Sequence, residues 1–352
     1  MHLCIRLKSA LESMKKESNI TIHDIAKALN ISGSTVSRAL NDNSRISEKT
    51  KKAVRDMAKQ LGYQPNALAS NLRTSCTKTI GVIIPRISRF FFSSAITGIE
   101  ELARTRGYSV IICQSNDQES REVDCTKTLF ASRVDGVISS IAINTVNFDH
   151  YKTFTSRNIP LVFFDRVCDE LETSQVVVDD FKGGFLAAEH LISKGCKRIA
   201  HLGGPQHLNI YINRLQGYLK ALRKHDFEIE EDLIIESLLT REDGKEGAKR
   251  LLDSPNRPDA IFAANDISAL SIILYAKEIG LRIPEDLAVV GFSNEPFSEF
   301  VSPSITTIEQ SGFDVGTKAT ELLLDIITNK TGNHQETIVL PVKLIERESS
   351  NR

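Results

Sequence analysis

The strongest constraint on the fold of this chain lies near its N-terminus, where capping signals mark two short helices in close succession. Thr21 stands three residues before Asp24, which is the reciprocal capping pattern of a helix start. Asn30 tolerates the left-handed backbone that a tight turn between helices needs. Ser32 is then placed to cap a second helix, predicted over 33–41. Two helices joined by such a turn form a helix-turn-helix.

A third helix is predicted over 48–61, behind a Ser47 cap, and it completes a small core. The apolar positions expected inside are Ile25, Ala26, Leu29, Val36, Leu40, Ala53, Val54, Met57 and Leu61. The sequence therefore predicts an all-α helix-turn-helix head over 20–64, preceded by a tail over 1–19. Met1 and Met14 are both possible starts of translation.

The exposed face of the second helix carries small and hydrogen-bonding side chains that suit the major groove of DNA. These residues are Gly33, Ser34, Thr35, Ser37, Arg38 and Asn41. Arg38 is of the type that binds guanine with two hydrogen bonds, and Asn41 can reach phosphate or base. A polar-faced helical hairpin without nucleic acid is the alternative, which fits this pattern less well.

Pro65 opens a short segment after the head, in which Leu68 and Leu72 stand four residues apart. So short a helix is marginal in water because nucleation is costly. We expect this segment to order only against a surface or a partner, and an inert linker is the alternative.

The charge of the chain is unevenly distributed, although the net charge is only −1. Residues 14–78 hold 12 Lys and Arg against 5 Asp and Glu, whereas the residues from Thr79 onward carry a net charge of −9. A basic head on an acidic body suits a polyanionic partner for the head alone.

From Thr79 onward, apolar strand patterns alternate with amphipathic helix patterns. Strands are predicted at Ile80–Pro85, Tyr108–Gln114, Val134–Ser140, Leu161–Asp165, Val176–Asp179, Arg198–Gly203, Ala260–Ala264 and Ala288–Phe292. Helices are predicted at Ser94–Arg106, Gly183–Lys194, Asn213–Lys224, Ser268–Ile279 and Phe313–Ile327. Runs of Val and Ile between helices are typical of parallel sheets covered on both faces. We expect two doubly wound parallel-sheet α/β lobes, one over 79–165 and 309–336 and the other over 166–308 and 337–352, joined to the head by a segment over 65–78.

Polar and aromatic residues follow several of these strands, where open α/β sheets bind their ligands. They are Phe91, Phe92, Asp165, Arg214, Asn265, Asp266 and Ser293. An aromatic face with Arg, Asp and Asn holds a polyhydroxylated ring by stacking and charge-assisted hydrogen bonds. Taken singly, each has another explanation, since an Asp can cap a helix, a Phe can be core and an Arg can be a surface charge.

Several motifs carry a resemblance that extends over nearly the whole chain. They are Thr21-Ile-His-Asp-Ile-Ala-Lys-Ala-Leu-Asn, Thr35-Val-Ser-Arg-Ala-Leu-Asn, Leu61-Gly-Tyr-Gln-Pro-Asn-Ala-Leu-Ala, Lys197-Arg-Ile-Ala-His-Leu-Gly-Gly-Pro, Arg214-Leu-Gln-Gly-Tyr, Phe262-Ala-Ala-Asn-Asp and Ile305-Thr-Thr-Ile. In this order they resemble the lactose/galactose-repressor (LacI/GalR) family, whose two lobes are of periplasmic-binding-protein type.

The resemblance implies further DNA contacts. It adds Thr21, Ile22, His23, Tyr63, Asn66, Ala69 and Leu72 to the DNA-binding set. In the family, the segment after the head is a hinge helix that folds against its dimer mate in the minor groove. The residue matching Leu72 wedges between base pairs there, and the residue matching Ala69 packs nearby.

The resemblance also implies an effector cleft. Phe91, Phe92, Asp165, Arg214 and Asn265 match positions that line it. Leu239 falls where an aromatic residue is frequent, and Ser293 replaces a frequent Asp. Arg86 and Arg89 stand where Asp and Asn are frequent. These two arginines and the loss of an acid favour an anionic sugar derivative as the effector.

The expected function is therefore a ligand-responsive, sequence-specific transcriptional regulator in the cytoplasm, and the resemblance implies that it is a repressor. It would bind a double-stranded, inverted-repeat operator as a homodimer and a sugar or sugar acid between its lobes. The chain lacks a terminal leucine heptad of the kind with which family members tetramerise. An enzyme is disfavoured because phosphate loops, nucleophile elbows and zinc motifs are missing, so no catalytic residue, cofactor or metal is expected. An exported solute-binding protein is disfavoured by the basic head and the lack of a signal-peptide pattern, and no apolar run could span a membrane.

Overall fold

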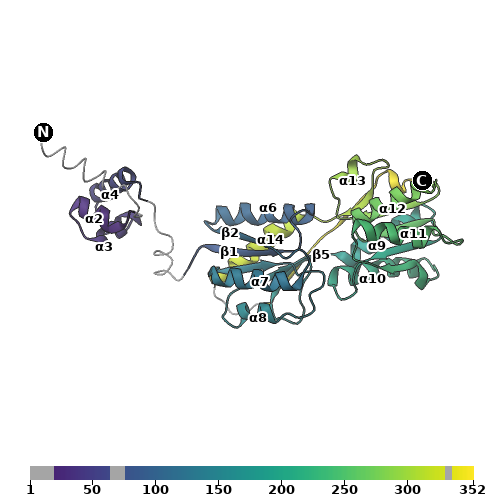
Figure 1. The fold of residues 1–352 in the computed structure, drawn as a ribbon, viewed down its shortest axis with the longest axis horizontal. Helices are drawn as coiled ribbons and strands as arrows, with labels where there is room; N and C mark the ends of the chain where they lie inside the picture. The colour runs from purple at the N-terminus through teal and green to yellow at the C-terminus, as the bar shows by residue number, and fades with distance from the viewer. Residues whose placement is uncertain (1–19, 64–75, 330–334) are drawn as a thin grey trace. The chain divides into compact units, whose positions relative to one another are not determined.

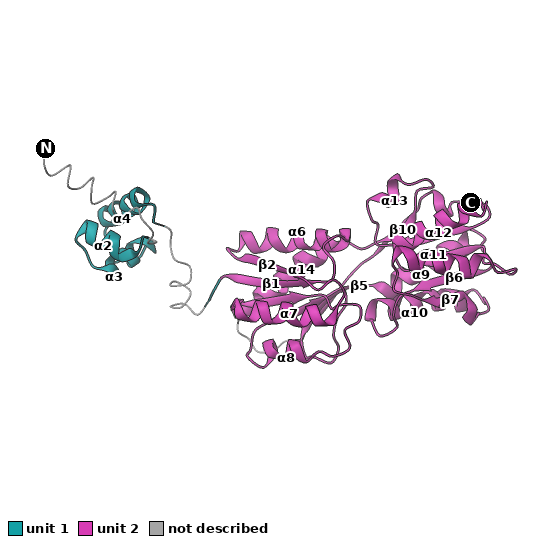
Figure 2. Cartoon of the chain, viewed as in Figure 1, with its two compact units in different colours: residues 1–77 teal, residues 78–352 magenta. Residues whose placement is uncertain are grey.

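The computed structural model describes residues 20–63, 76–329 and 335–352. The chain divides into two compact units, residues 1–77 and 78–352, which are coloured separately in Figure 2. The first unit contains the helical head, and the second is an α/β body with two sheets.

The described part of the head consists of three helices, α2 (Ile22–Leu29), α3 (Gly33–Leu40) and α4 (Glu48–Leu61) (Figure 1). The backbone N–H and the hydroxyl of Thr21 donate to the Asp24 carboxylate at 2.8 and 2.7 Å. Asn30 adopts a left-handed φ of 54° and ends α2. The predicted helix-turn-helix is therefore confirmed. The Thr21–Asp24 pair caps α2 and the left-handed Asn30 ends it, as the sequence indicated.

Serine caps begin the other two helices of the head. The Ser32 hydroxyl accepts from the N–H of Thr35, and the Ser47 hydroxyl accepts from the N–H of Thr50, each at 3.2 Å. The second helix ends one residue earlier than predicted, because Asn41 is its C-cap.

One apolar cluster joins the three helices. Its buried members are Ile25, Ala26, Val36, Ala39, Val54 and Ala58. The prediction of Ala53 as a core residue was wrong, since its side chain is exposed. Val54 and Ala58 lie four residues apart on the buried side of α4, and Ala53 lies one helical position away from that side.

The first sheet of the body has the strand order β11-β5-β4-β3-β1-β2. Its strands are β1 (Thr79–Ile84), β2 (Ser109–Gln114), β3 (Gly136–Ser139), β4 (Leu161–Phe164), β5 (Ser174–Val178) and β11 (Thr337–Leu340). All of its pairings are parallel, and the register places Ile80 beside Val110 and Gly136.

The second sheet has the strand order β12-β10-β9-β8-β6-β7. Its strands are β6 (Ile199–Gly203), β7 (Ile234–Glu236), β8 (Ala260–Ala263), β9 (Ala288–Phe292), β10 (Thr306–Glu309) and β12 (Lys343–Ile345). Its pairings are parallel except for that of β10 with β12.

Helices cover both faces of each sheet (Figure 1), which confirms the two doubly wound lobes. The first sheet lies between α6 (Phe90–Thr105) with α14 (Gly312–Asn329) and α7 (Glu119–Ala131) with α8 (Asp149–Thr155). The second lies between α9 (Asp180–Ser193) with α10 (Asn209–Lys224) and α11 (Arg241–Leu252) with α12 (Asp266–Glu278). The short elements η1 (Glu231–Leu233), α13 (Phe297–Phe300) and η2 (Glu348–Ser350) complete the second lobe.

Two glycines let α9 and α10 approach closely. A Cβ atom on Gly184 would lie 2.0 Å from the carbonyl oxygen of Arg214, and one on Gly217 would lie 2.0 Å from that of Phe181. This close crossing brings Arg214 of α10 beside Asp180 of α9.

The division into lobes differs from the predicted one at two strands. β5 pairs with β4 and β11 pairs with β5, so both belong to the first lobe and not to the second. The described chain passes between the lobes after Val178, Glu309 and Leu340. The predicted boundaries at 165 and 336 were wrong because the sequence of a short strand does not indicate which sheet it joins. Only its pairing with a neighbouring strand does.

Among the described residues, no helix combines the length and the apolar character needed to cross a lipid bilayer.

Candidate functional site

The predicted DNA-binding residues of the head cluster around α3. Gly33, Ser34, Thr35, Ser37 and Arg38 lie on this helix and Asn41 is its cap, whereas Thr21, Ile22 and His23 begin α2 and Tyr63 follows α4. Thr21, His23, Ser34, Arg38 and Asn41 are exposed, and the others are half-buried. Asn66, Ala69 and Leu72 lie outside the described residues.

The polar side chains of α3 are held by bonds within the helix. The Ser32 hydroxyl lies 2.8 Å from the hydroxyls of both Ser34 and Thr35. The Asn41 side-chain amide donates to the carbonyl of Ser37 at 2.8 Å. These groups are therefore oriented before any partner binds.

Small size and ion pairs fix α3 against its neighbours. A Cβ atom on Gly33 would lie 3.3 Å from the imidazole Nδ1 of His23, so glycine allows the first turn of α3 to sit beside α2. At the other end, the Asp42 carboxylate pairs with Lys51 at 3.0 Å and Arg55 at 2.8 Å, both on α4. These contacts hold α3 against α2 and α4, and the Arg38 side chain on α3 is exposed.

The body contains a cavity of about 600 Å³ at the carboxyl ends of strands from both sheets. All seven predicted effector residues line it, namely Phe91, Phe92, Asp165, Arg214, Leu239, Asn265 and Ser293. Their convergence agrees with the rule for ligands in open α/β sheets. Their role in effector binding stays a prediction.

An aromatic wall comes from the first turn of α6. The rings of Phe91 and Phe92 pack edge to face with centroids 5.2 Å apart, and Phe92 contacts Phe164 at 6.1 Å. Leu239, at a left-handed φ of 56°, adds an aliphatic wall from the second lobe.

Asp165 is a buried carboxylate with few partners. It follows β4 in the left-handed conformation, with φ of 61°. Burial raises its pKa, against the lowering effect of nearby Arg166. Among the described residues, its carboxylate accepts a long hydrogen bond of 3.4 Å from the Ser140 hydroxyl. The carboxylate is therefore available to accept hydrogen bonds from a bound hydroxyl group.

Arg214 is fully engaged with protein groups. Its Nε donates to Asp180 at 2.8 Å, one terminal nitrogen donates to the carbonyl of Ala264 at 2.8 Å, and the other reaches Gln310 at 3.4 Å. Its guanidinium stacks 3.6 Å from the ring centre of Phe292. Burial raises the pKa of Asp180 to about 6, although Arg214 opposes this shift. Arg214 lies in the second turn of α10, not at its start as predicted.

Asn265 and Ser293 are also bonded inside the second lobe. The Asn265 side chain caps α12, accepting from the N–H of Ser268 at 2.8 Å and donating to the carbonyl of Leu239 at 3.0 Å. The Ser293 hydroxyl accepts from Gln310 at 3.0 Å. Ligand binding at these residues would use their remaining lone pairs or replace one of these bonds.

Sequence reasoning missed a charged cluster in the first lobe. The Asp117 carboxylate accepts from Arg86 at 2.7 Å and from Arg166 at 2.6 Å. Burial raises the pKa of Asp117, but the guanidinium groups of Arg166 and Arg86 outweigh this effect, and the pKa is lower than that of a free Asp. The Nε of Arg166 is buried without a hydrogen-bond partner in the described part of the chain. The adjacency of Arg166 to Asp165 at a strand end was the available signal.

Further contacts cross from one lobe to the other. The Glu295 carboxylate accepts from the backbone N–H of Phe90 and faces Arg89, while burial raises the pKa of Glu295. The His207 imidazole lies 2.8 Å from the carbonyl of Ile143. The Asn209 side chain donates to the carbonyl of Asp165 at 2.9 Å.

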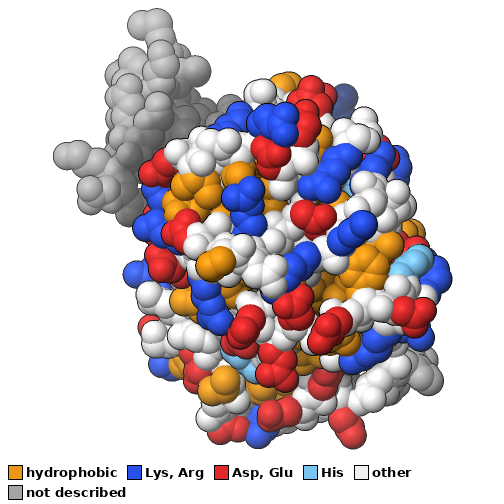
Figure 3. All heavy atoms as spheres, turned by 90° about the vertical axis from the view of Figure 1, so that its right-hand side faces the viewer, with side chains coloured by type: hydrophobic (Ala, Val, Ile, Leu, Met, Phe, Trp, Pro, Cys, Tyr) orange, Lys and Arg blue, Asp and Glu red, His pale blue; other side chains and the backbone are white. Residues whose placement is uncertain are grey.

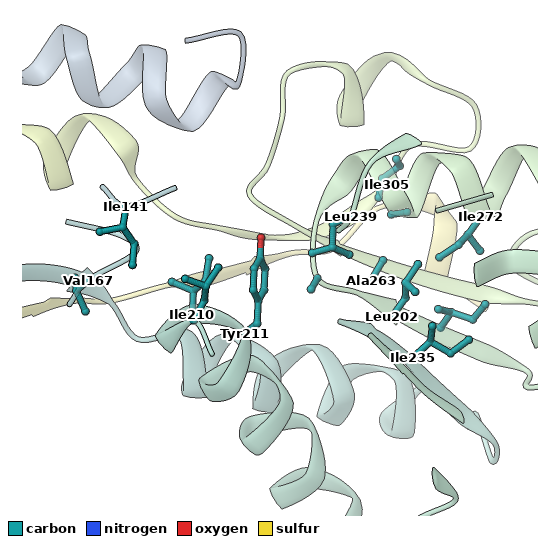
Figure 4. Packing of buried hydrophobic residues seen from close by; sticks show 14 of the residues in the cluster. Ile141, Val167, Leu202, Ile210, Tyr211, Ile235, Leu239, Ala263, Ile272 and Ile305 are labelled. Atoms are coloured by element: carbon teal, nitrogen blue, oxygen red, sulfur yellow. The ribbon is translucent and has the colours of Figure 1, made fainter. Parts of the chain in front are cut away.

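Apolar packing continues between the lobes. Ile210 and Tyr211 belong to one buried cluster that includes Ile141 and Val167 on one side and Leu239 on the other (Figure 4). The Tyr211 side chain lines the cavity, and Figure 4 shows it extending from α10 with its hydroxyl at the tip. Movement of one lobe would therefore be transmitted to the other through packed side chains.

Two family models match the chain. Residues 21–66 match the bacterial regulatory proteins of the lacI family, and residues 188–350 match a periplasmic binding protein-like domain. The lobes are thus of the expected type.

Curated relatives match the chain over nearly its full length. The transcriptional repressor PurR of Mannheimia succiniciproducens is 33% identical over 94% of this chain and 98% of the relative. Catabolite control protein A of Priestia megaterium is 31% identical over 94% and 99%. The transcriptional repressor CytR of Escherichia coli is 34% identical over 90% and 92%.

Solved structures agree with these relatives. The Lac repressor dimer bound to operator and the anti-inducer ONPF has a TM-score of 0.85 at 26% identity, covering 95% of this chain and all of that chain. A complex of the regulator CelR with cellobiose has a TM-score of 0.72 at 28% identity, covering 94% and 99%. The helix-turn-helix head, the two-lobed body and these full-length matches together identify the chain as a member of the lacI family of bacterial DNA-binding transcriptional regulators.

Proposed function

We propose that this regulator binds an inverted-repeat operator as a dimer, represses transcription in the cytoplasm, and responds to a carbohydrate bound between its lobes. One observation carries the effector proposal. Asp165 and Arg166 both line the cavity, and the buried Asp165 carboxylate and the buried Nε of Arg166 have unused hydrogen-bonding capacity among the described residues. A sugar hydroxyl donates to the first and accepts from the second, so one ligand can satisfy both.

The charges in the cavity favour a neutral sugar over an anionic one. The lining holds the basic residues Arg86, Arg89, Arg166, Arg214 and Arg241 and the acidic residues Asp117, Asp165, Asp266, Glu242 and Glu295. Arg86 and Arg166 share Asp117, Arg214 pairs with Asp180, and Arg89 faces Glu295. A carboxylate or phosphate that bonded to Arg86, Arg89 or Arg214 would compete with these pairs, whereas a neutral sugar would leave them in place, so we prefer a neutral sugar to the anionic effector expected from the sequence.

Similar proteins bind neutral sugars, which supports this ligand class. The similar CelR structure contains cellobiose, and a regulator from Enterococcus faecium with bound ribose has a TM-score of 0.67 at 30% identity, covering 77% of this chain and 98% of that chain. A cavity of about 600 Å³ lies within the range of small-molecule sites.

DNA binding is assigned to the head. Its net positive charge contrasts with the end of the second lobe, where Figure 3 shows acidic and basic side chains interspersed. A single head is weak alone, and two heads related by a twofold axis match the two halves of an inverted repeat. We propose that Asn66, Ala69 and Leu72 add minor-groove contacts in the DNA complex.

The position of the cavity between the lobes supports coupling between effector binding in the body and DNA binding by the head. Asp165 and Arg166 extend from the first lobe, whereas Asn265 and Ser293 extend from the second. A ligand that bonds to residues of both lobes binds one arrangement of the lobes better than another. Such a preference is required for a ligand to control the affinity for DNA.

A thermal-shift screen tests the ligand class. Neutral pentoses, hexoses and disaccharides are compared with uronates and sugar phosphates, since a bound ligand stabilises the native state. We expect a neutral sugar to raise the melting temperature of the wild type and to lose this effect in Asp165→Asn. A shift produced only by acids would contradict the neutral preference, and an undiminished shift in the variant would contradict the site. Incubation of the stabilising sugar with the protein, followed by product analysis, tests the proposed absence of turnover.

A further inference from the structure

One side chain of the second lobe forms two hydrogen bonds to the backbone of the first lobe. Asn209 is the first residue of α10, and its amide oxygen accepts from the backbone N–H of Val167 at 3.1 Å. Its amide nitrogen donates to the backbone carbonyl of Asp165 at 2.9 Å. We call these two bonds the Asn209 clamp. They lie on either side of Arg166, so the clamp holds the short segment that carries Asp165 and Arg166 at the cavity.

The chemistry of the Asn209 side chain matches these two backbone groups. A backbone N–H needs an acceptor and a backbone carbonyl needs a donor, and a side-chain amide supplies both from neighbouring atoms. Helix α10 starts at Leu208 without a side-chain capping bond. Among the described residues, both hydrogen bonds of the Asn209 side chain go to the first lobe. This side chain therefore serves the 165–167 segment and not the start of its own helix.

The segment in the clamp has a backbone conformation that needs support from its surroundings. Asp165 has a φ of 61°, in the left-handed region that residues other than glycine rarely adopt. Such a conformation costs free energy and persists where the surrounding bonds determine it. Within the first lobe, the N–H of Asp165 donates to Val176 at 3.1 Å, and the carbonyl of Arg166 accepts from Ile141 at 3.2 Å. The clamp adds the bonds to the carbonyl of Asp165 and to the next N–H but one.

Helix α10 also carries a cavity residue of the second lobe. Arg214 lies in the second turn of this helix and lines the cavity. It bonds to Asp180 at 2.8 Å and reaches Gln310 at 3.4 Å, and both partners lie in segments where the chain passes between the lobes. One helix thus joins Arg214, two of the crossing segments and, through Asn209, the first-lobe side of the cavity.

We propose that Asn209 is a positioning residue of the effector site, which holds Asp165 and Arg166 in place for the ligand and fixes them relative to Arg214. The proposal rests on the proposed function, because that function gives Asp165 and Arg166 their contacts with a sugar. Without the side-chain amide, the carbonyl of Asp165 and the N–H of Val167 lose their partners. Asp165 would then relax to a negative φ, which turns its carboxylate and the neighbouring guanidinium out of their places in the cavity.

Residue-resolved hydrogen exchange on the full-length protein tests the clamp without any sugar. In Asn209→Ala, we expect the Val167 amide to exchange roughly tenfold faster, because a local opening no longer breaks this bond, while the amides of α9 and α10 stay protected. In Asn209→Asp, a carboxylate oxygen still accepts from Val167, so exchange there should stay closer to that of the wild type. Asn213→Ala removes an exposed amide from the same helix, and this matched control should change nothing.

The titration of Asp165 tests whether the clamp positions its carboxylate. Burial raises the pKa of this group in the folded protein. Carbon-13 NMR of the side-chain carboxyls, assigned with Asp165→Asn, should show a lower pKa in Asn209→Ala, because the released carboxylate moves toward water. A loss of stability alone would not lower this pKa while the protein stays folded. An unchanged Val167 exchange or an unchanged Asp165 pKa in Asn209→Ala would overturn the proposal, as would faster exchange along the whole of α10.

Sugar binding separates this proposal from the proposed function. Ribose and cellobiose, which are bound in similar structures, are titrated by calorimetry into the wild type and the variants. A sugar that binds the wild type should lose roughly tenfold or more in affinity in Asn209→Ala and nothing in Asn213→Ala. Equal affinities in the wild type and Asn209→Ala would refute the positioning role. If neither sugar binds the wild type while exchange and titration respond as expected, the clamp stands and the sugar assignment loses its support.

Discussion

The exposed face of α3 and the wall of the cavity satisfy their polar groups in different ways. On α3, Ser34, Thr35 and Asn41 bond to atoms no more than four residues away. In the cavity, Arg214 bonds to Asp180, Ala264 and Gln310, which are 34, 50 and 96 residues away in the sequence. The first surface is local and exposed, and the second is assembled from distant segments and buried.

This difference separates two kinds of functional residue. A side chain on α3 can be removed without stranding a partner, so its loss should affect DNA binding and leave the fold intact. A charged side chain in the cavity leaves an unpaired group inside the protein when its partner is removed. Effector binding and stability of the body are therefore coupled, whereas DNA recognition and stability of the head are largely separate.

The largest effect is expected from Asp180→Ala, which leaves the buried Arg214 guanidinium without its counter-ion. We expect the body to lose roughly 3–5 kcal/mol of unfolding free energy. Urea unfolding followed by probes of the body measures this loss. Asp149→Ala, which removes an exposed partner of Lys152, is the control and should change nothing measurable. Equal losses in the two variants would remove the distinction between buried and exposed pairs.

A smaller effect, confined to DNA binding, is expected from Arg38→Ala. The variant should lose about 1–3 kcal/mol on a selected operator and discriminate less at one base pair, with unfolding unchanged. Binding titrations on operator and on random DNA measure the specific and the non-specific affinity. Lys52→Ala removes an exposed charge of the same sign from α4 and serves as the control. An equal loss on both DNAs would mean that Arg38 contacts phosphate alone.

The two regions should also respond to pH with opposite signs. Burial raises the pKa of Asp266 to about 7, against hydrogen bonds from Thr307, Glu295 and Ser298. The folded body then holds a proton that the unfolded chain releases, so its stability falls as pH rises from about 4 to 7, at most by roughly 1.4 kcal/mol per pH unit. Asp180 acts in the same direction.

In the head, hydrogen bonds from Thr21 lower the pKa of Asp24, and those from Lys51 lower that of Asp42. The head should therefore lose stability as pH falls below about 4. Thermal unfolding across pH 3–8 with separate probes checks both slopes. Asp266→Asn should flatten the slope of the body, and a slope that persists unchanged would show that other groups cause it.

The smallest effect is expected from Ser32→Ala, which removes the cap of α3. The loss should be about 1 kcal/mol in the unfolding of the head, with none in the body. Ser34→Ala, which removes a hydroxyl that only contacts Ser32, is the control and should cost less. If the two cost the same, the hydroxyl cluster and not the cap would stabilise this helix.

Local signals explain how much of the head could be predicted. Ser47 and Gly62 bracket α4 at the predicted bounds, and Thr21 with Asp24 mark the start of α2. The error at Ala53 arose because alanine fits either side of a helix. Such signals need no knowledge of the rest of the chain.

Distant pairing explains what could not be predicted in the body. Strand-end positions indicated Asp165 and Ser293, because parallel strands bring their carboxyl ends to one edge. Asp117 and Glu295 were missed because their place in the cavity depends on how loops from separate segments meet. The strands β7, β10, β11 and β12 were missed because each is short and contains Thr, Glu or Lys, whereas the equally short β4 and β8 are runs of buried apolar residues.

The interrupted first lobe has a consequence for synthesis of the protein. β11, the partner of β5, is translated after all of the second lobe except β12 and η2. At about 5–20 residues per second, the roughly 160 residues between these strands take on the order of 10–30 s to emerge. During that interval the edge of β5 has no partner, and the face later covered by α14 is bare. The exposed edge of β5 is a site at which another strand could pair, and ribosomal pausing within α9 to β10 would lengthen its exposure.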